Sequence, residues 1–479
     1  MQEDKKIDMN QSKQPIFLNI SKYLLIITLL LTASSCGEDR RTEYKDRTDI
    51  NDWIEVEMRD KYLWYEDIPD ASKLNPYQMP ELFFSSLLSD KDGKKGRKYS
   101  TIERLSENTR SSYNGGIAKH SNEFQFILYK NEEKTQTFTA RILYVVPNTS
   151  AEKAGLKRGD WVLKINDAPI TLKSAEVLRG SESLNLLVGR MIAEETIISQ
   201  ELHLPAPEAL HENPVMLIDK FQVNGEEIGY LVYNSFKDGY KEDSQEFNDA
   251  LRAASHKLKG VRKLILDLRY NGGGTLSSAT LLGTLLAPQK EIQNKALFCY
   301  LEGNDKQRPR RMDFNFEMKL LQSGVNLDLE ELYVLTSEYT ASASELIINS
   351  LKPYQKVIVI GNTTEGKNVA ARSIKDPSKT WQINPIFSKV YNVEEQSDYE
   401  KGITPHFQLD AESIENFEFY LPLGDTNELL LSKALDIIRE KEQSRTPESG
   451  QTRSISPYRK LTPVYNSLDE KSSILSVEE

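Results

Sequence analysis

The chain has 479 residues, a formal net charge of −11 at pH 7 and two cysteines. The acidic balance argues against nucleic-acid binding, and two cysteines are too few for a disulfide framework. A hydrophobic fraction of 38% beside 28% charged residues is that of a globular protein, and the length suffices for two or three domains.

The N-terminal segment has the features of a secretory leader. Tyr23 to Leu31 is an apolar run with Lys13 and Lys22 ahead of it; it is too short to span a bilayer and fits the core of a signal peptide. Small residues then precede Cys36, which resembles the lipobox of bacterial lipoproteins. We expect residues 1–36 to be a lipoprotein signal peptide and Cys36 to carry lipid (palmitate), which holds the chain in the bacterial cell envelope with the outer membrane favoured. An ordinary signal peptide with a chance cysteine is the alternative.

The next part of the chain predicts a small helical region. Residues 37–50 are polar and lack an apolar period, so we expect a tether. Apolar residues recur at helical spacing from Asn51 to Tyr65, which begins an N-terminal helical region over residues 51–112. The lysine-rich stretch from Ser89 to Ser100 is expected to be a solvated loop.

Short strand patterns then predict a β-rich domain over residues 113–204. Ile142 to Ile170 contains a strand, a short helix, a glycine turn and a second strand, and it resembles a PDZ domain. Such domains bind extended peptides, often C-terminal ones, by adding a strand to a sheet edge. Gly115 to Ile117 and Glu123 to Phe126 are rival candidates for the carboxylate-binding loop. A PDZ-like spacer without a peptide grip is the alternative.

A β-α-β pattern opens the part of the chain from 205 to 442. Strands are expected over Ile228 to Tyr233 and Lys263 to Leu268, with an amphipathic helix from Phe247 to Leu258 between them. This order predicts an α/β fold with a mostly parallel sheet. The second strand runs into DLRYNGGGTL, Asp267 to Leu276, where consecutive glycines let backbone N–H groups approach an anion closely.

A second strand–loop–helix unit carries a candidate nucleophile. Ser342 lies at or near the start of the predicted helix, where free backbone N–H groups favour a developing negative charge. None of the five histidines lies in this stretch, so Lys367 is the candidate base. A lysine can accept a proton only if burial lowers its pKa from about 10.4 towards neutrality. A helix-capping serine and a solvated lysine are the alternatives.

The segment TASASELIINSLKPYQKVIVIGNTTEGK resembles the nucleophile-and-base segment of the C-terminal processing peptidases, or tail-specific proteases. The resemblance implies a crotonase-like α/β catalytic core without a metal or organic cofactor. It also implies that Ser342 is the nucleophile, that Lys367 is the base, and that the backbone N–H groups of Gly273 and Ala343 hold the oxyanion. Ala371 departs from the family, which commonly carries an orienting glutamine there.

Three further features lie outside the predicted reaction. Gly361 to Asn368 nearly matches a phosphate-binding loop, but Asn368 lacks the hydroxyl for magnesium and a strand pattern follows, so nucleotide binding is not expected. His406 stands where the family commonly has an acid, and we interpret it as structural. Residues 443–479 are polar and rich in Ser, Pro, Glu and Arg, so we expect a disordered tail.

The sequence therefore predicts a lipid-anchored envelope serine endopeptidase that acts on polypeptides, with the PDZ domain as a site for their C-termini. Two alternatives stay open: a catalytically silent scaffold of the same fold, which Ala371 favours, and a carrier of apolar small molecules. The distance between Ser342 Oγ and Lys367 Nζ is the deciding observation. A value of about 2.6–3.2 Å, or somewhat looser in the free enzyme, is expected for a working pair.

Overall fold

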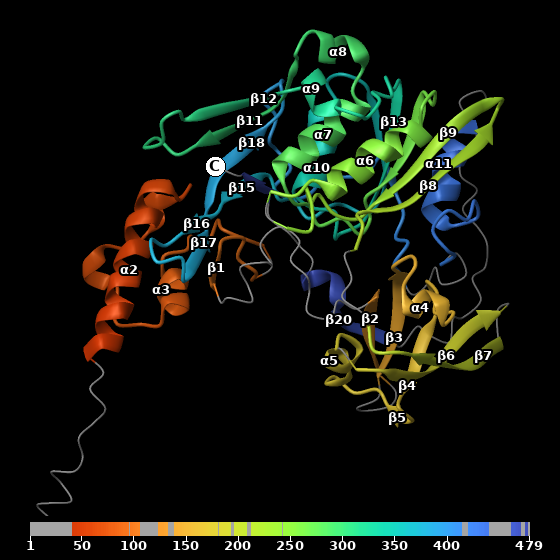
Figure 1. Ribbon diagram of the computed structural model, residues 1–479, viewed down its shortest axis with the longest axis horizontal. Helices are drawn as coiled ribbons and strands as arrows, with labels where there is room; N and C mark the ends of the chain where they lie inside the picture. Colours follow the sequence, from red (N-terminus) through yellow and green to blue (C-terminus); the bar gives the residue numbers. More distant parts are fainter. Residues whose placement is uncertain are drawn as a thin grey trace, which may run out of the picture.

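The computed structural model describes a part of the chain that comprises residues 41–94, 96–105, 123–132, 138–180, 182–192, 196–207, 212–241, 243–413, 420–439, 461–470 and 475–477. Figure 1 shows three parts: helices from the N-terminal region on the left, a large α/β domain at the top, and a smaller β-rich domain below it. The leader with Cys36 lies outside the described residues, as does the candidate loop Gly115 to Ile117. Within the described part, no helix is both long and apolar enough to cross a bilayer.

The N-terminal region is built on helix α2 (Arg41–Lys61), which packs on α3 (Pro80–Ser86). The side chains of Ile54, Met58 and Tyr62 are fully buried, as their helical spacing requires. Because α2 begins at Arg41, the prediction of a tether over residues 37–50 is wrong for its second part. Adding a turn to a packed helix costs far less than starting one, so polar residues can extend it.

The loop between these helices and the α/β domain is more ordered than its lysine-rich sequence indicates. Asp92 is fully buried, and its carboxylate accepts hydrogen bonds from the Tyr62 hydroxyl (2.9 Å) and from the N–H groups of Tyr99 (2.9 Å) and Ser100 (3.0 Å). The prediction of a solvated loop from Ser89 to Ser100 is therefore wrong at these residues, because a carboxylate inside the loop satisfies its backbone.

The N-terminal region is tied to the α/β domain by a shared sheet. Strand β1 (Thr101–Arg104) pairs antiparallel with β17 (Trp381–Asn384), and β17 also pairs with β16 (Ile374–Lys375). Residues of α2 and α3 share an apolar cluster with Val369, Ala371 and other residues of the α/β domain. The helices are thus packed onto the α/β domain rather than held on a spacer.

The β-rich domain below has a seven-stranded sheet, in which six strands follow the order β20-β2-β3-β4-β6-β7 and β5 pairs with β4. Its elements within residues 123–204 are β2 (Phe124–Asn131), β3 (Phe138–Val145), α4 (Ser150–Lys153), β4 (Trp161–Ile165), β5 (Ala168–Pro169), α5 (Ser174–Leu178), β6 (Leu184–Ile192) and β7 (Thr196–Leu204). Just before β2, the Glu123 carboxylate accepts hydrogen bonds from the Ser150 hydroxyl and the Ala151 N–H, both at 2.6 Å. Glu123 therefore caps α4.

The α/β domain is organised around a six-stranded sheet in the order β19-β14-β13-β10-β9-β8. Its strands are β8 (Val215–Val223), β9 (Glu226–Tyr233), β10 (Lys263–Asp267), β13 (Glu331–Thr336), β14 (Lys356–Gly361) and β19 (Phe407–Gln408). The five from β9 onward pair in parallel, and β8 pairs antiparallel with β9. The predicted α/β fold with a mostly parallel sheet is confirmed.

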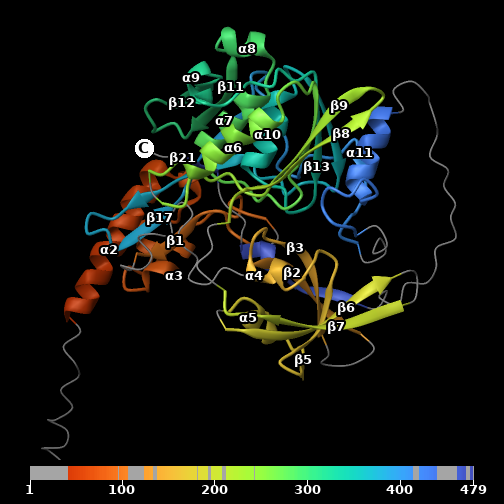
Figure 2. The same ribbon diagram turned by 45° about the vertical axis from the view of Figure 1, so that its right-hand side comes forward.

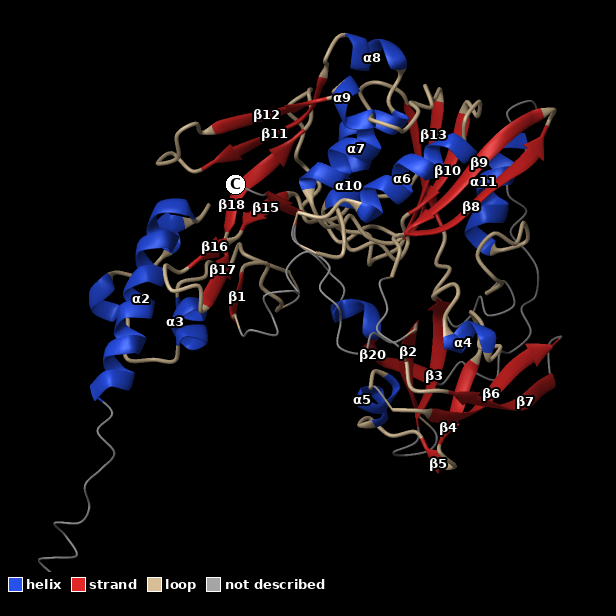
Figure 3. Ribbon diagram, viewed as in Figure 1, coloured by secondary structure: helices blue, strands red, loops and turns tan. Residues whose placement is uncertain are grey.

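Helices cover both faces of this sheet (Figure 3). One apolar cluster joins it to α6 (Glu246–Lys257), α7 (Leu276–Leu286) and α10 (Ala343–Leu351), and a second joins the opposite face to α11 (Leu429–Arg439). Successive strand residues alternate between the two clusters, as Leu264 and Ile265 do. Shorter helices α8 (Gln289–Gln293) and α9 (Met318–Leu321) each add one buried residue, Ile292 and Leu321, to the first cluster.

A second sheet of the α/β domain includes a strand from the end of the chain. Its order is β12-β11-β18-β15-β21, with β11 (Leu297–Gly303), β12 (Arg311–Asn315), β15 (Val369–Arg372), β18 (Ile386–Tyr391) and β21 (Leu475–Val477). Strand β20 (Leu461–Asn466) instead pairs with β2 of the β-rich domain. The prediction of a disordered tail is wrong for these strands, because sheet edges bind through backbone groups that any polar sequence also carries.

Candidate active site

Ser342 is the N-terminal cap of α10, in the loop that follows β13. Its backbone has φ 60 and ψ −113, a conformation that costs a non-glycine residue free energy and clusters at functional sites. The side chain is 1% exposed, and its Oγ has no hydrogen-bond partner among the described residues. No other group of the described chain therefore holds this hydroxyl by a hydrogen bond.

The glycine loop after β10 passes directly against this serine. Gly273 has φ 105, and a Cβ atom placed on it would lie 2.7 Å from Ser342 Cβ and 3.1 Å from Ala343 N. Any side chain there would collide with the start of α10. The loop therefore needs glycine to bring its backbone next to Ser342.

The two predicted oxyanion donors differ in their present state. Ala343 is the first residue of α10, a position whose N–H has no acceptor within the helix. The Gly273 N–H donates to Asn271 Oδ1 at 2.9 Å. The Ala343 N–H can therefore donate to an oxyanion directly, whereas the Gly273 N–H must first break its hydrogen bond to Asn271 Oδ1.

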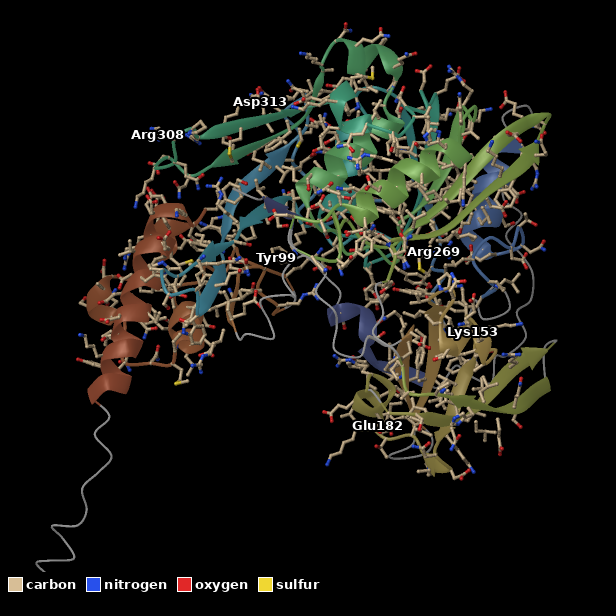
Figure 4. All side chains as sticks on the ribbon, in the orientation of Figure 1. Tyr99, Lys153, Glu182, Arg269, Arg308 and Asp313 are labelled. Carbon is tan, nitrogen blue, oxygen red and sulfur yellow. The ribbon has the colours of Figure 1, made fainter. Side chains whose placement is uncertain are left out.

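Lys367 lies between β14 and β15 and is 3% exposed. Its Nζ is 5.0 Å from the centre of the Tyr99 ring, and Figure 4 shows Tyr99 where the N-terminal region meets the α/β domain. Burial lowers the pKa of Lys367 to about 7; the Arg97 charge also lowers it, while Glu365 and Glu345 oppose the shift. A large share of the amine is therefore neutral near pH 7, as a general base requires.

The backbones of the two residues are brought together, but their reactive atoms are not in contact. Because Ser342 Oγ has no hydrogen-bond partner among the described residues, it does not bond directly to Lys367 Nζ. The N–H groups of both residues donate to Glu345 Oε2, each at 2.8 Å, so the two nitrogens lie within twice 2.8 Å of each other. The hydrogen-bonded pair expected of a working site is therefore not formed in this structure.

Glu345 organises this region and was missed in the sequence analysis. Its carboxylate is fully buried, and Oε1 accepts hydrogen bonds from the Gly366 N–H (2.7 Å) and the Thr364 hydroxyl (2.5 Å). Burial raises the pKa of Glu345, although these hydrogen bonds oppose the shift. A glutamate three residues after a capping serine is a capping-box pattern, which is the signal that could have identified it.

The position of the missing glutamine offers no polar group. Ala371 lies in β15, is buried, and packs in the apolar cluster shared with the N-terminal helices. The resemblance of Gly361 to Asn368 to a phosphate-binding loop is a separate point. Such a loop is followed by a helix, whereas strand β15 follows Lys367.

The remaining predicted residues have structural roles. The His406 ring nitrogen Nδ1 accepts a hydrogen bond from the Val359 N–H at 3.0 Å, and the backbone N–H of His406 donates to the Val359 carbonyl at 2.8 Å. Within the described part of the chain, no group of His, Cys, Asp and Glu side chains could hold a metal ion. Cys299 is a buried free thiol in β11.

A buried network of charges joins the β-rich domain to the strand end that carries the glycine loop. Arg269 bonds to Glu428 through Nη1 (2.5 Å) and Nη2 (2.9 Å) and lies 2.8 Å from Asp267. Arg158 of the β-rich domain donates to the Leu421 carbonyl at 2.9 Å and also to the Tyr270 hydroxyl. Figure 4 shows Arg269 at the edge of the α/β domain that faces the β-rich domain. The two domains are therefore held together next to the candidate site.

Comparison with protein families assigns most of the described chain. The model of the peptidase S41 N-terminal domain matches residues 49–101, that of the PDZ domain matches 141–188, and that of peptidase family S41 matches 227–409. The last range contains Ser342 and Lys367. The β-rich domain is accordingly called the PDZ domain below.

Individual proteins agree with these matches. A crystal structure assigned to the S41 proteases, from Bacteroides fragilis NCTC 9343, is 37% identical with a TM-score of 0.72, covering 81% of this chain and 96% of that one. CtpA-like serine proteases of Staphylococcus aureus are 27% identical over 286 residues, covering 58% of this chain and 51% of theirs. That of Staphylococcus saprophyticus is 26% identical over 292 residues, covering 58% and 52%. The chain thus spans about half the length of the curated relatives it matches.

Proposed function

Since the chain belongs to peptidase family S41, we propose that it is a serine endopeptidase with Ser342 as nucleophile and Lys367 as general base. One observation carries the proposal. Ser342 is buried and has a strained backbone, and Lys367 is buried with its pKa lowered to about 7. The backbone N–H groups of both residues donate hydrogen bonds to the same carboxylate, that of Glu345. These are the groups that an activated hydroxyl nucleophile needs.

The mechanism begins with neutral Lys367. Its amine takes the proton of Ser342 Oγ as that oxygen attacks a peptide carbonyl, and the negative charge forms on the carbonyl oxygen. The Ala343 N–H stabilises this oxyanion, and the Gly273 N–H joins it by leaving Asn271 Oδ1. Loss of one such donor costs about 3–4 kcal/mol in comparable enzymes.

The second half returns the enzyme to its starting state. The Lys367 ammonium gives its proton to the leaving amine, which breaks the peptide bond and leaves an ester on Ser342. Water then attacks the ester while Lys367 accepts a proton from it. Lys367 returns that proton to Ser342 Oγ as the bond between Oγ and the acyl carbon breaks, and the carboxylic acid product is released. The catalytic step requires Nζ to move within hydrogen-bond reach of Oγ, as free enzymes commonly require on binding substrate.

The proposal extends to substrate and location. Substrates are polypeptides, because PDZ domains bind extended peptide segments and this one is fixed beside the site by Arg158. Attachment to the cell envelope through Cys36 is supported by the apolar leader and the small residues before that cysteine.

Hydrolysis of unfolded casein by the purified chain tests the peptidase. Ser342→Ala and Lys367→Ala should each abolish hydrolysis, whereas Ser85→Ala and Lys352→Ala, at exposed positions, should retain it. If the purified chain binds casein without cleaving it between pH 6 and 9, the silent scaffold replaces the peptidase. That second candidate is favoured by Ala371 and by the hydrogen bond that now engages the Gly273 N–H.

A further inference from the structure

We propose that the C-terminal segment that carries β20 and β21, described over residues 461–470 and 475–477, is an internal ligand, which occupies the polypeptide-binding edges of both the PDZ domain and the α/β domain and must leave before a substrate binds. The inference rests on the proposed function, because it identifies the route that a substrate polypeptide would follow. Figure 1 shows β20 at the PDZ domain, and Figure 2 shows β21 at the α/β domain.

The first contact reproduces the way in which PDZ domains bind peptides. Strand β20 pairs antiparallel with β2, with Tyr465 opposite Leu128 and Thr462 opposite Lys130. The Tyr465 ring is 5.7 Å from the Phe126 ring. The guanidinium of Arg179, just after α5, is 6.0 Å from the centre of the same Tyr465 ring. The segment thus adds a strand to the free edge of the PDZ sheet and places an aromatic side chain between β2 and α5.

The segment then crosses to the α/β domain. The Phe126 N–H donates to the Ser467 hydroxyl at 2.9 Å, and the buried Leu468 side chain belongs to a cluster that joins PDZ residues to Tyr270 beside the glycine loop. Arg97 donates to the Asp469 carbonyl at 3.3 Å. Because Arg97 also forms an ion pair with Glu365 at 3.5 Å, two residues before Lys367, the segment reaches the surroundings of the candidate base.

The second contact lies between the two halves of the candidate site. Strand β21 pairs in parallel with β15, with Ser476 opposite Ala371, four residues after Lys367. The Ser476 N–H also donates to the Gly274 carbonyl at 3.2 Å, one residue after Gly273. An extended backbone here is bound on one side by the strand that follows the base and on the other by the loop that borders the nucleophile.

Two apolar side chains anchor this second contact. Leu475 is buried in the main cluster of the α/β domain, and Val477 is partly buried against the same cluster. Ser476 between them is held through backbone groups, which do not depend on side-chain identity. An extended substrate polypeptide with apolar residues at the same places could make these contacts equally well.

In the inferred state the protein blocks access to its own candidate site. The side chains of Ser342 and Lys367 are both buried in this structure, and β21 lies between the strand that follows Lys367 and the glycine loop that borders Ser342. A polypeptide that displaces β20 from the PDZ edge loosens the attachment of β21 as well, because the same stretch of chain carries both strands. Docking at the PDZ domain would then open the candidate site.

Full-length variants test the proposal. Tyr465→Asp combined with Leu475→Asp should raise kcat/KM for unfolded casein about tenfold, mainly through KM, because apparent affinity scales with the fraction of open molecules. Val464→Asp is the matched control, since this neighbour on β20 is 42% exposed and should leave activity unchanged. A synthetic peptide of residues 461–477 should inhibit the double variant competitively and leave the native chain unaffected.

The outcomes separate the inference from the proposed function. A folded double variant with native activity that the peptide does not inhibit overturns the inference and leaves the peptidase intact. If no chain hydrolyses casein, the peptidase fails, and fluorescence anisotropy of the labelled peptide decides the inference. Binding to the double variant but not to the native chain supports it, whereas no binding to either overturns it. Should the double variant fail to fold, Ser476→Pro, which removes the N–H donated to Gly274, is put through the same measurements.

Discussion

Two cations of the α/β domain are both buried, but their pKa values are shifted in opposite directions. Arg269 is 1% exposed; although desolvation opposes its charge, Asp267 and Glu428 raise its pKa well above the usual value. Lys367 is nearly as buried, but desolvation outweighs the attraction of Glu365 and Glu345, and its pKa falls to about 7. Burial alone therefore does not decide whether a cation is structural or reactive; the balance between desolvation and the attraction of neighbouring carboxylates does.

The chemistry of the two side chains fits this division. A guanidinium keeps its charge and offers a planar set of donors, which suits the two-point contact between Arg269 and Glu428. An ammonium is a compact charge whose pKa shifts readily on burial. The reactive position thus has the cation that can become neutral, and the domain junction has the one that cannot.

The largest expected effect comes from giving the reactive position the other cation. Lys367→Arg cannot accept a proton at neutral pH, so kcat for casein hydrolysis should fall by about 10³-fold or more. Lys352→Arg, on the exposed end of α10, should have native activity. Substantial activity in a folded Lys367→Arg chain would show that another group is the base.

The reverse experiment removes the structural cation. Arg269→Met leaves Asp267 and Glu428 buried together and should lower the free energy of unfolding by about 3–5 kcal/mol in urea denaturation at pH 7. Arg262→Met, at an exposed ion pair with Glu330, should cost less than about 1 kcal/mol.

The same network predicts a pH dependence. Although desolvation opposes it, Arg269 lowers the pKa of Glu428 below its usual 4.5. The stability from this pair is therefore complete above pH 4.5 and is lost as pH falls through the lowered pKa. A native chain whose stability stays flat through this acid range would contradict the assignment.

Glu345→Gln tests whether the carboxylate holds the two reactive residues in place. The amide can no longer accept hydrogen bonds from four donors, so the backbones of Ser342 and Lys367 should separate and kcat should fall about 10–100-fold with little change in KM. The exposed Glu394→Gln is the control. A change confined to KM would assign Glu345 to substrate binding instead.

Removing the reactive cation altogether should stabilise the fold. The folded-state pKa of Lys367 is lowered from 10.5 to about 7, so its burial costs free energy that grows as pH falls between these values. Lys367→Met removes this cost and should raise the free energy of unfolding at pH 7 by about 1–3 kcal/mol while abolishing hydrolysis. Lys352→Met should change neither. Destabilisation by Lys367→Met would mean that the amine is held by its partners as firmly as Arg269.

The smallest effect concerns the pH profile. Hydrolysis should rise with pH as Lys367 loses its proton, with a midpoint near its pKa of about 7. Arg97→Gln removes a positive charge that lowers this pKa, so the midpoint should move to higher pH by less than about one unit. Added salt should reduce the shift, because Arg97 is partly exposed.

The mixed α/β fold with its PDZ domain and helical N-terminal region could be predicted, because each depends on a side-chain pattern. Alternation places Leu264 and Ile265 on opposite faces of the sheet, and the glycine run before α7 marks a close backbone approach. Strands β20 and β21 could not be predicted this way, since their pairing uses backbone groups that leave little trace in the sequence.

The candidate site was predicted only in its main residues. The segment that resembles the C-terminal processing peptidases predicted Ser342 and Lys367, and the structure brings their backbones together. The role of Glu345 and the nearness of Tyr99 to Lys367 depend on how distant segments meet, which local patterns do not encode. Neither could the sequence indicate that the Gly273 N–H is engaged by Asn271.

Strands β20 and β21 belong to the same molecule as the edges they cover, and this sets a threshold for any competitor. A segment on the same chain acts at an effective concentration on the order of millimolar, however dilute the protein is. A free polypeptide at micromolar concentration must therefore bind roughly a thousandfold better to take its place. Long unfolded chains, which present many overlapping binding segments at once, meet that threshold more easily than short peptides do.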